Sequence, residues 1–219
     1  MRFRFFSCQN IEPMDTKTLG IGENKTDAYI KLEYRTSKLK TKIIKAMEGG
    51  TAHWYQEMLV PAQVPIIGGR LVFKVYDDDL SGDEIVGSIF YDLRDIIPDA
   101  NGKPGKLNGR FEWKNIYGAP MEMSGNWVDK MNENPEVASY WKGRILVQAV
   151  AELSEKPLLL VKDMEPDVIE LAEDCYEMRD YQVRCFFYGA LNCPEVGEFG
   201  VSMRIADKEW KLDKPVTVK

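Results

Sequence analysis

The chain has 219 residues with a formal net charge of −6, and 44% of its residues are hydrophobic. This is enough for one domain of roughly 130 to 150 residues with a full core, plus an appended segment. The acidic balance argues against nucleic acid as a partner, and against a constitutive attraction to acidic membranes.

The N-terminal part predicts β-strands separated by polar loops. It begins with an aromatic strand at Arg2–Ser7. A loop rich in Gly, Thr, Asn and Asp follows at residues 11–28, with Asp15 near its start and Asp27 near its end. Residues 27–34 and 38–45 then alternate with period two, which predicts two strands.

Basic residues gather on these two predicted strands. Lys38, Lys40 and Lys42 share one face of the second strand, and Lys31 and Arg35 lie on the first. Lysines that protect an exposed sheet edge from unwanted pairing explain such a pattern. A surface that binds acidic headgroups or an acidic protein is the alternative.

An acidic loop between two apolar strands is the most informative stretch. The strand that begins at Leu71 runs into Asp77, Asp78 and Asp79, then Asp83 and Glu84, and a second strand follows at Ile85–Tyr91. Like charges so close together repel one another. Calcium relieves that repulsion because it binds about six to eight oxygen ligands and accepts carboxylates readily. A solvated acidic turn is the other interpretation.

The C-terminal part changes character after a last long strand at Trp141–Ala151. Residues 98–109 form a polar loop and residues 121–139 a surface excursion that returns to the sheet. After a connector, Pro166 opens a predicted helix that should dock through apolar residues at helical spacing, namely Val168, Leu171, Ala172 and Cys175. Tyr181–Ala190 and Glu198–Ile205 are predicted strands of a second, incomplete β unit.

Three tracts in this order resemble the signature segments of C2 domains. They are DAYIKLEY after the first acidic loop, TAHWYQEMLVP, and VYDDDLSGDEIVG with Gly87 opening the next strand. Within C2 domains the chain is most similar to the ferlins, through LVPAQVPIIGGR, FEWKNIYGAP, YWKGRILVQAVAE and the tail DYQVRCFFYGALNC. The tail resembles the segment after the central C2 domain of a ferlin.

The resemblance implies a mainly β fold, an eight-stranded antiparallel β-sandwich of the circularly permuted type II topology. Residues 1–152 are then the C2 domain. Residues 153–219 are a linker, a helix and the start of a following β unit, which packs on the C2 domain or on a partner.

The same resemblance implies a calcium site where the loops meet at one end of the sandwich. One or two ions are expected on Asp15, Asp27, Asp77 and Asp79, with Glu84 or Asp83 as the fifth ligand. Counting back from Gly87 favours Glu84. Leu19, Ile21 and Leu80 offer modest apolar contacts at the loop tips.

These features predict a cytoplasmic, peripheral membrane protein that binds anionic phospholipid with calcium, in membrane trafficking or fusion. The alternative is a calcium-independent interaction module in a large assembly, with a protein partner on the tail or on the lysine-rich strand. The sequence lacks a nucleophile, base or phosphate-binding constellation, so we expect no enzyme. One histidine and four cysteines without a CxxC pair argue against zinc, and the cysteines are expected to be reduced core thiols.

Overall fold

The computed structural model describes most of the chain. The described residues are 1–13, 26–34, 36–45, 50–63, 69–79, 82–99, 101–120, 123–176, 184–186, 188, 198–205, 208–211 and 216–217. The chain divides into two compact units, Met1–Glu177 and Met178–Lys219, and each is considered by itself.

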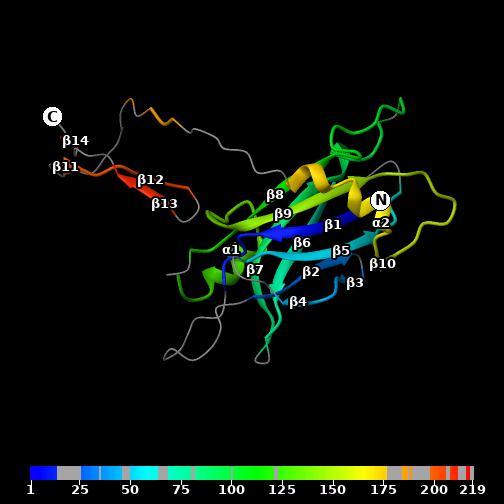
Figure 1. Cartoon of the computed structure of the whole chain (residues 1–219), viewed down its shortest axis with the longest axis horizontal. Coiled ribbons are helices and arrows are strands. Elements are labelled where there is room, and N and C mark those ends of the chain that lie inside the picture. Colours follow the sequence, from blue (N-terminus) through cyan, green and yellow to red (C-terminus); the bar gives the residue numbers. More distant parts are fainter. Residues whose placement is uncertain are drawn as a thin grey trace. The chain divides into compact units, whose positions relative to one another are not determined.

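The first unit is a β-sandwich with short helices in its connections (Figure 1). Its strands are β1 (Arg2–Gln9), β2 (Asp27–Tyr34), β3 (Ser37–Lys40), β4 (Ile44–Lys45), β5 (Ala52–Leu59), β6 (Arg70–Asp77), β7 (Glu84–Asp92), β8 (Phe111–Gly118), β9 (Tyr140–Val150) and β10 (Leu160–Asp163). Its helical segments are η1 (Leu93–Asp95), α1 (Trp127–Glu133), α2 (Pro166–Glu170) and η2 (Glu173–Tyr176).

The strands follow one hydrogen-bonded path, β10-β5-β1-β9-β8-β7-β6-β2-β3, with β4 also paired to β2. The path turns from one layer into the other between β8 and β7, which pair at Ser88 and Tyr117. Apart from β4 and β10, eight strands remain, and the first of them pairs with the fourth and the last. This is the type II arrangement. The antiparallel eight-stranded sandwich predicted from the sequence is therefore confirmed.

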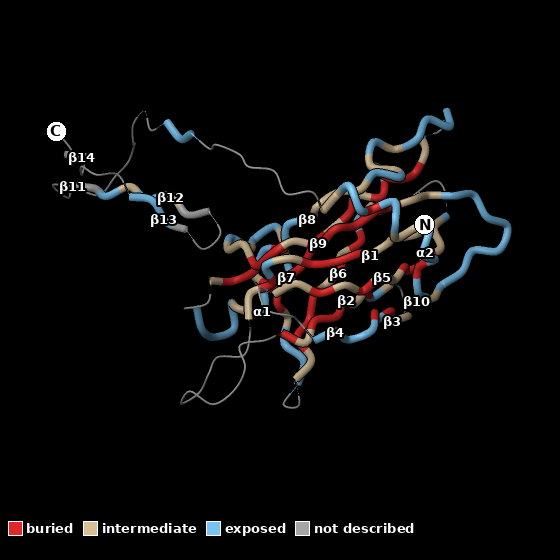
Figure 2. Tube along the Cα trace, in the orientation of Figure 1, coloured by how far each residue is buried: buried red, intermediate tan, exposed pale blue. Residues whose placement is uncertain are grey.

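The core forms where the inward residues of the two layers meet (Figure 2). The Phe73 ring on β6 lies 4.8 Å from the Phe3 ring and 5.2 Å from the Phe5 ring, both on β1. Trp54 on β5 is fully buried and donates its indole N–H to the Ala28 carbonyl on β2 at 3.3 Å. Alternation along the strands thus delivers the aromatic side chains to the core.

Gly87 lies where β7 passes closest to β8. A Cβ atom there would lie 2.6 Å from the Tyr117 carbonyl oxygen and 2.6 Å from an Ile116 methyl group. Next to it, β7 carries one extra residue, Val86, opposite the Val75–Tyr76 step of β6. A bulge of this kind bends a strand, and here it lies where the path leaves one layer for the other.

We predict that Gly87→Ala destabilises the first unit by about 1–3 kcal/mol, because backbone atoms must shift to admit the methyl group. The free energy of unfolding in urea measures this loss. Gly69→Ala is the matched control, since its nearest neighbour is a side-chain carboxylate oxygen of Asp92 at 3.2 Å. Equal stability of the two variants would contradict the close approach.

The segment after the last sandwich strand adds to the sheet. Residues 160–163, expected as part of a connector, form β10, which pairs antiparallel with β5 from Leu160↔Leu59 to Asp163↔Gln56. The helix begins at Pro166 as predicted, but α2 ends at Glu170 and the shorter η2 follows. The domain boundary at residue 152 stays a prediction.

The helical segment packs on the outer face of the sheet in a small apolar cluster. Ala172 and Met164 are buried there with Phe6 and Leu146, and Val168 and Cys175 pack against them. Trp113 donates its indole N–H to the Cys175 carbonyl at 3.1 Å. The expectation that Leu171 docks with these residues is wrong, because Leu171 is 64% exposed. It points to solvent after the helix tightens toward η2.

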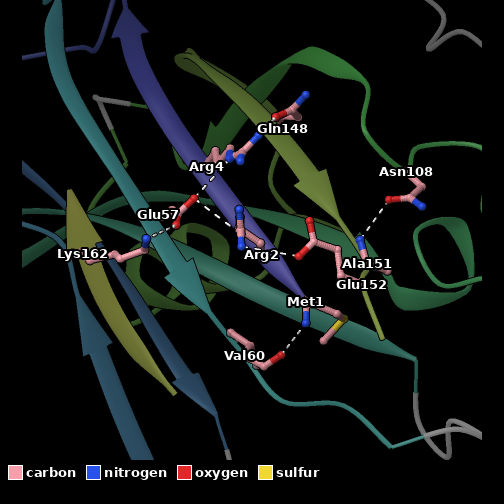
Figure 3. A network of polar contacts seen from close by, with 10 residues as sticks. All are labelled: Met1, Arg2, Arg4, Glu57, Val60, Asn108, Gln148, Ala151, Glu152 and Lys162. Atoms are coloured by element: carbon pink, nitrogen blue, oxygen red, sulfur yellow. Dashed lines mark hydrogen bonds and ion pairs between the residues drawn. The ribbon is translucent and has the colours of Figure 1, made fainter. Parts of the chain in front are cut away.

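A buried carboxylate joins β10 to the sheet (Figure 3). The Glu57 side chain is 4% exposed, and its oxygens lie 3.2 Å from the Arg4 guanidinium and 3.1 Å from the Lys162 ammonium. Arg2 is also close, at 3.6 Å. The three cations come from β1 and β10, so this single acid bridges the central strand and the added edge strand.

We predict that Glu57→Gln lowers the stability of the first unit by about 3 kcal/mol, because it removes the anion that Arg4 and Lys162 share and leaves Arg2 with Glu152. Urea unfolding of the variant tests this. Glu136→Gln removes an exposed pair with Arg70 and should cost less than about 1 kcal/mol. A Glu57 variant no less stable than the Glu136 variant would show that the network contributes nothing.

The second unit contains two short antiparallel pairs. β11 (Glu198–Phe199) pairs with β14 (Val216–Thr217), and β12 (Ser202–Ile205) pairs with β13 (Lys208–Lys211). The predicted strand Glu198–Ile205 is thus two strands, and the predicted strand Tyr181–Ala190 lies mostly outside the described residues.

Cys185 is exposed, unlike the buried Cys8, so the expectation of core thiols fails for Cys185. None of the described helices has the length and apolar character needed to cross a bilayer.

Candidate functional site

Two predicted ligands meet where β2 begins and β6 ends. Asp27 is the first residue of β2 and Asp77 the last of β6, on neighbouring antiparallel strands. The Asp27 backbone N–H donates to an Asp77 carboxylate oxygen at 2.6 Å, and the Asp78 N–H donates to the Asp27 carbonyl at 3.1 Å. Asp77 is only 1% exposed. A backbone donor thus holds the Asp77 carboxylate at the mouth of the loop.

Glu84 and Asp83, the two candidates for the fifth ligand, occupy different positions. Glu84 is the strand partner of Asp77, and directly opposed residues place their side chains on the same face of a sheet. Asp83 instead accepts a hydrogen bond from the Tyr29 hydroxyl at 2.5 Å. The strand register therefore places Glu84 opposite Asp77. The hydrogen bond from Tyr29 places Asp83 at the outer face of β2.

Tyr29 belongs to a small aromatic and charged group on that outer face. Its ring stacks on Tyr76 with centroids 5.1 Å apart, and the Lys40 ammonium lies 3.6 Å from its centroid. Lys40 also lies 3.2 Å from an Asp78 carboxylate oxygen. Burial, followed by the hydrogen bond to Asp83, raises the pKa of Tyr29 well above its usual value. The hydroxyl therefore stays a neutral donor, and two of the loop carboxylates have partners within the chain.

The first loop is fixed where it leaves the sandwich. The Thr26 hydroxyl donates to the Glu12 carbonyl at 3.1 Å, and the Glu12 N–H donates to the Lys142 carbonyl at 3.1 Å. The Lys142 ammonium lies 2.8 Å from a Glu12 carboxylate oxygen, and both side chains are largely buried. Three predicted site residues of this loop lie outside the described residues: Asp15, Leu19 and Ile21. Leu80 of the second loop also lies outside them.

The donor set fits a calcium ion in chemistry and only in part in geometry. Carboxylate oxygens on Asp27, Asp77 and Glu84 are the ligands that calcium prefers. Within the described ranges, however, no three His, Cys, Asp or Glu side chains stand close enough to hold an ion. Asp79 is half-buried at the start of the loop, and its carbonyl accepts the Gly82 N–H at 3.2 Å. The calcium site remains a prediction.

The lysines form a row across three strands and have acidic neighbours. Lys31 on β2 lies opposite Lys40 on β3 and Lys74 on β6, so the three share the outer face. These lysines, and two predicted lysines outside the row, have acidic side chains within 4 Å. In the row, Glu33 lies 3.3 Å from Lys31, and Glu133 lies 3.0 Å from Lys74. Outside it, Glu33 lies 3.8 Å from Lys38, and Asp163 lies 3.8 Å from Lys42. Arg35 lies outside the described residues. The row is a partly neutralised surface.

Sequence reasoning missed three elements around the site. Nothing in the sequence indicated that Tyr29 would contact the acidic loop, apart from its place in the DAYIKLEY tract. Lys45 faces Asp27 across β4 and β2, a pairing that arises because residues 38–45 form two strands where one was expected. Helix α1 was expected as an irregular excursion, yet its apolar residues at 127, 128 and 131 follow helical spacing.

Comparison with known proteins finds relatives of this chain. Residues 1–108 match the model of the C2 domain family. The chain is 22% identical over 200 residues to myoferlin of Xenopus tropicalis, which covers 80% of this chain and 10% of that protein. The chain carries a C2 domain related to those of the ferlins. It therefore spans about a tenth of the length of this relative.

Two solved structures are also similar to this ferlin-like chain. A pair of C2 domains from extended synaptotagmin 2, solved with calcium bound, is 20% identical with a TM-score of 0.41, over 68% of this chain and 44% of that one. A C2 domain-containing protein from an elicitor-responsive gene is 17% identical with a TM-score of 0.43, over 71% of this chain and 90% of that one.

Proposed function

We propose that this ferlin-like C2 domain binds anionic phospholipid membranes in the presence of calcium, as a peripheral membrane module in trafficking or fusion. The observation that carries the proposal is the meeting of Asp27 and Asp77, with Glu84 opposite Asp77 in the register. In this proposal Asp15 and Asp79 complete the calcium ligands, with Asp83 as the alternative to Glu84.

The physical basis is electrostatic. Without metal, the carboxylates at this end repel lipid phosphates as well as one another. Each calcium ion adds about two positive charges locally, and phosphate oxygens can then complete its coordination shell. We expect an affinity on the order of micromolar to millimolar for the chain alone, because lipid oxygens supply part of the coordination shell in this proposal.

We predict that Asp77→Asn together with Asp79→Asn abolishes calcium-dependent vesicle binding and the calcium-induced rise in melting temperature. Asparagine keeps an oxygen that can accept the Asp27 N–H, so the fold should survive. Vesicle co-sedimentation and thermal unfolding, each with calcium or chelator, measure the two effects.

The matched control is Asp78→Asn, which removes a charge from the same loop beside Lys40. It should retain both calcium effects. A wild-type chain that shows neither a thermal shift nor vesicle binding at millimolar calcium contradicts the proposal.

Lys38 and Lys40 on β3 and Lys42 just after it, called the β3 lysines, supply a second contact in this proposal. We predict that replacing Lys38, Lys40 and Lys42 with alanine weakens binding to phosphoinositide-containing vesicles and flattens its salt dependence. Lys103, Lys106 and Lys156 are exposed lysines outside these strands, and replacing them is the control. Equal binding by both triple variants at low salt would leave edge protection as the role of the β3 lysines.

A calcium-independent interaction module is the second candidate. It is favoured by the contacts of Lys40 with Asp78 and of Tyr29 with Asp83, which engage part of the acidic loop without an ion. Calorimetry with calcium separates the two functions, because this alternative predicts no heat of calcium binding.

A further inference from the structure

The connection between β8 and β9 exposes a tryptophan. Trp127, the first residue of α1, is 64% exposed, although tryptophan is among the largest apolar side chains. The Lys130 ammonium lies 4.7 Å from its ring centroid, and Met123 in the preceding turn is also exposed. The indole and the ammonium group therefore share one surface, which we call the α1 surface and define as Trp127 and Lys130.

The opposite side of α1 is firmly held. The Asn132 side chain accepts the Ala119 N–H and donates to the Ile85 carbonyl, both at 2.7 Å. The Lys74 ammonium lies 3.0 Å from a Glu133 carboxylate oxygen. Residues in an α-helix are about 100° apart, so Trp127 lies about 140° around the axis from Asn132. The sandwich thus supports the helix on one side while the indole projects on the other.

This attachment places α1 beside the acidic end of the sandwich. Ile85, whose carbonyl receives the Asn132 bond, directly follows Glu84 in β7. Gly118, at the end of β8, lies so close to α1 that an added Cβ would be 2.5 Å from the Asn132 oxygen. Helix α1 is therefore attached to β7 next to Glu84, the strand partner of Asp77.

We propose that the α1 surface is an interfacial membrane anchor, with the Trp127 indole at the headgroup level and Lys130 near lipid phosphate. The proposal rests on the proposed function for the orientation of this end toward the bilayer. It adds an apolar contact that does not involve the calcium ligands.

A bilayer interface suits this surface better than a protein partner does. Tryptophan has an apolar ring and one polar N–H, so it favours the boundary between headgroups and acyl chains. Lysine beside an apolar face is typical of helices that lie in this boundary, where anionic lipid attracts the ammonium group. A short helix with one aromatic side chain gives a shallow contact, so it should act together with the calcium-dependent one.

The test uses the whole chain and vesicles of phosphatidylcholine and phosphatidylserine, with calcium or with chelator. We expect Trp127→Ala to weaken calcium-dependent binding by about tenfold and to leave the calcium-induced thermal shift unchanged. Leu171→Ala is the matched control, because Leu171 is also 64% exposed but lies after α2. It should bind as the wild type does.

Brominated acyl chains supply a direct readout, since they quench only tryptophans that reach the bilayer. The chain has five tryptophans, so wild type is compared with Trp127→Phe. Quenching that is present in the wild type and lost in the variant supports the anchor. Equal quenching, or equal binding by Trp127→Ala, overturns it while leaving calcium-dependent binding intact.

The two proposals fail separately. If calcium does not increase vesicle binding, the proposed function fails, and quenching of Trp127 in chelator decides the anchor. Quenching there supports it, and its absence overturns it. Self-association that Trp127→Ala abolishes, without quenching by lipid, assigns the surface to protein contacts and also overturns the anchor.

Discussion

The apolar contact between the two layers, centred on Phe73, is the interaction on which the rest of the first unit depends. The layers are joined along the backbone path at one place, the β7–β8 pair, so side-chain packing must hold them together elsewhere. Phe3 and Phe5 reach Phe73 from the opposite layer. Buried aromatic pairs provide both apolar area and a preferred geometry, which fixes how the strand ends of the two layers meet.

The acidic end shows how such a scaffold tolerates a buried carboxylate. Asp77 is removed from water by the strands around it, and a charge there is costly unless hydrogen bonds replace the lost solvent. The Asp27 N–H replaces part of it, because β2 and β6 are neighbours in register. On the outer face, Tyr29 and Lys40 engage Asp83 and Asp78. The structure thereby separates the acids at the mouth of the loop from those on the outer face.

Local sequence patterns predicted most strands. They could not predict strand pairs and ion pairs between residues that are distant in the sequence. Period-two alternation predicts β2 with its bounds. The expectation that Gly87 opens the next strand is wrong, because β7 begins at Glu84 and Gly87 lies inside it, at the close approach to β8. β10 was missed because its four residues gain their stability from β5, about a hundred positions earlier. The acidic partner of Lys42, Asp163, is also far away in the sequence, so the predicted lysine face looked more basic in the sequence than it is. The prediction for Leu171 was wrong for a local reason. Leu171 lies between α2 and η2, where the regular α-helical spacing ends.

On the proposed function, two membrane contacts carried by the same domain need not be strong individually. Calcium bridging acts through the carboxylates of β2, β6 and β7, while Trp127 acts through α1, and Asn132 ties α1 to Ile85 next to Glu84. Once one contact reaches the bilayer, the other is held at a high effective concentration because little flexible chain separates them. Their free energies then largely add, since the entropy of bringing the domain to the membrane is lost only once. Calcium would then control binding without providing all of its strength, which suits a reversible peripheral module.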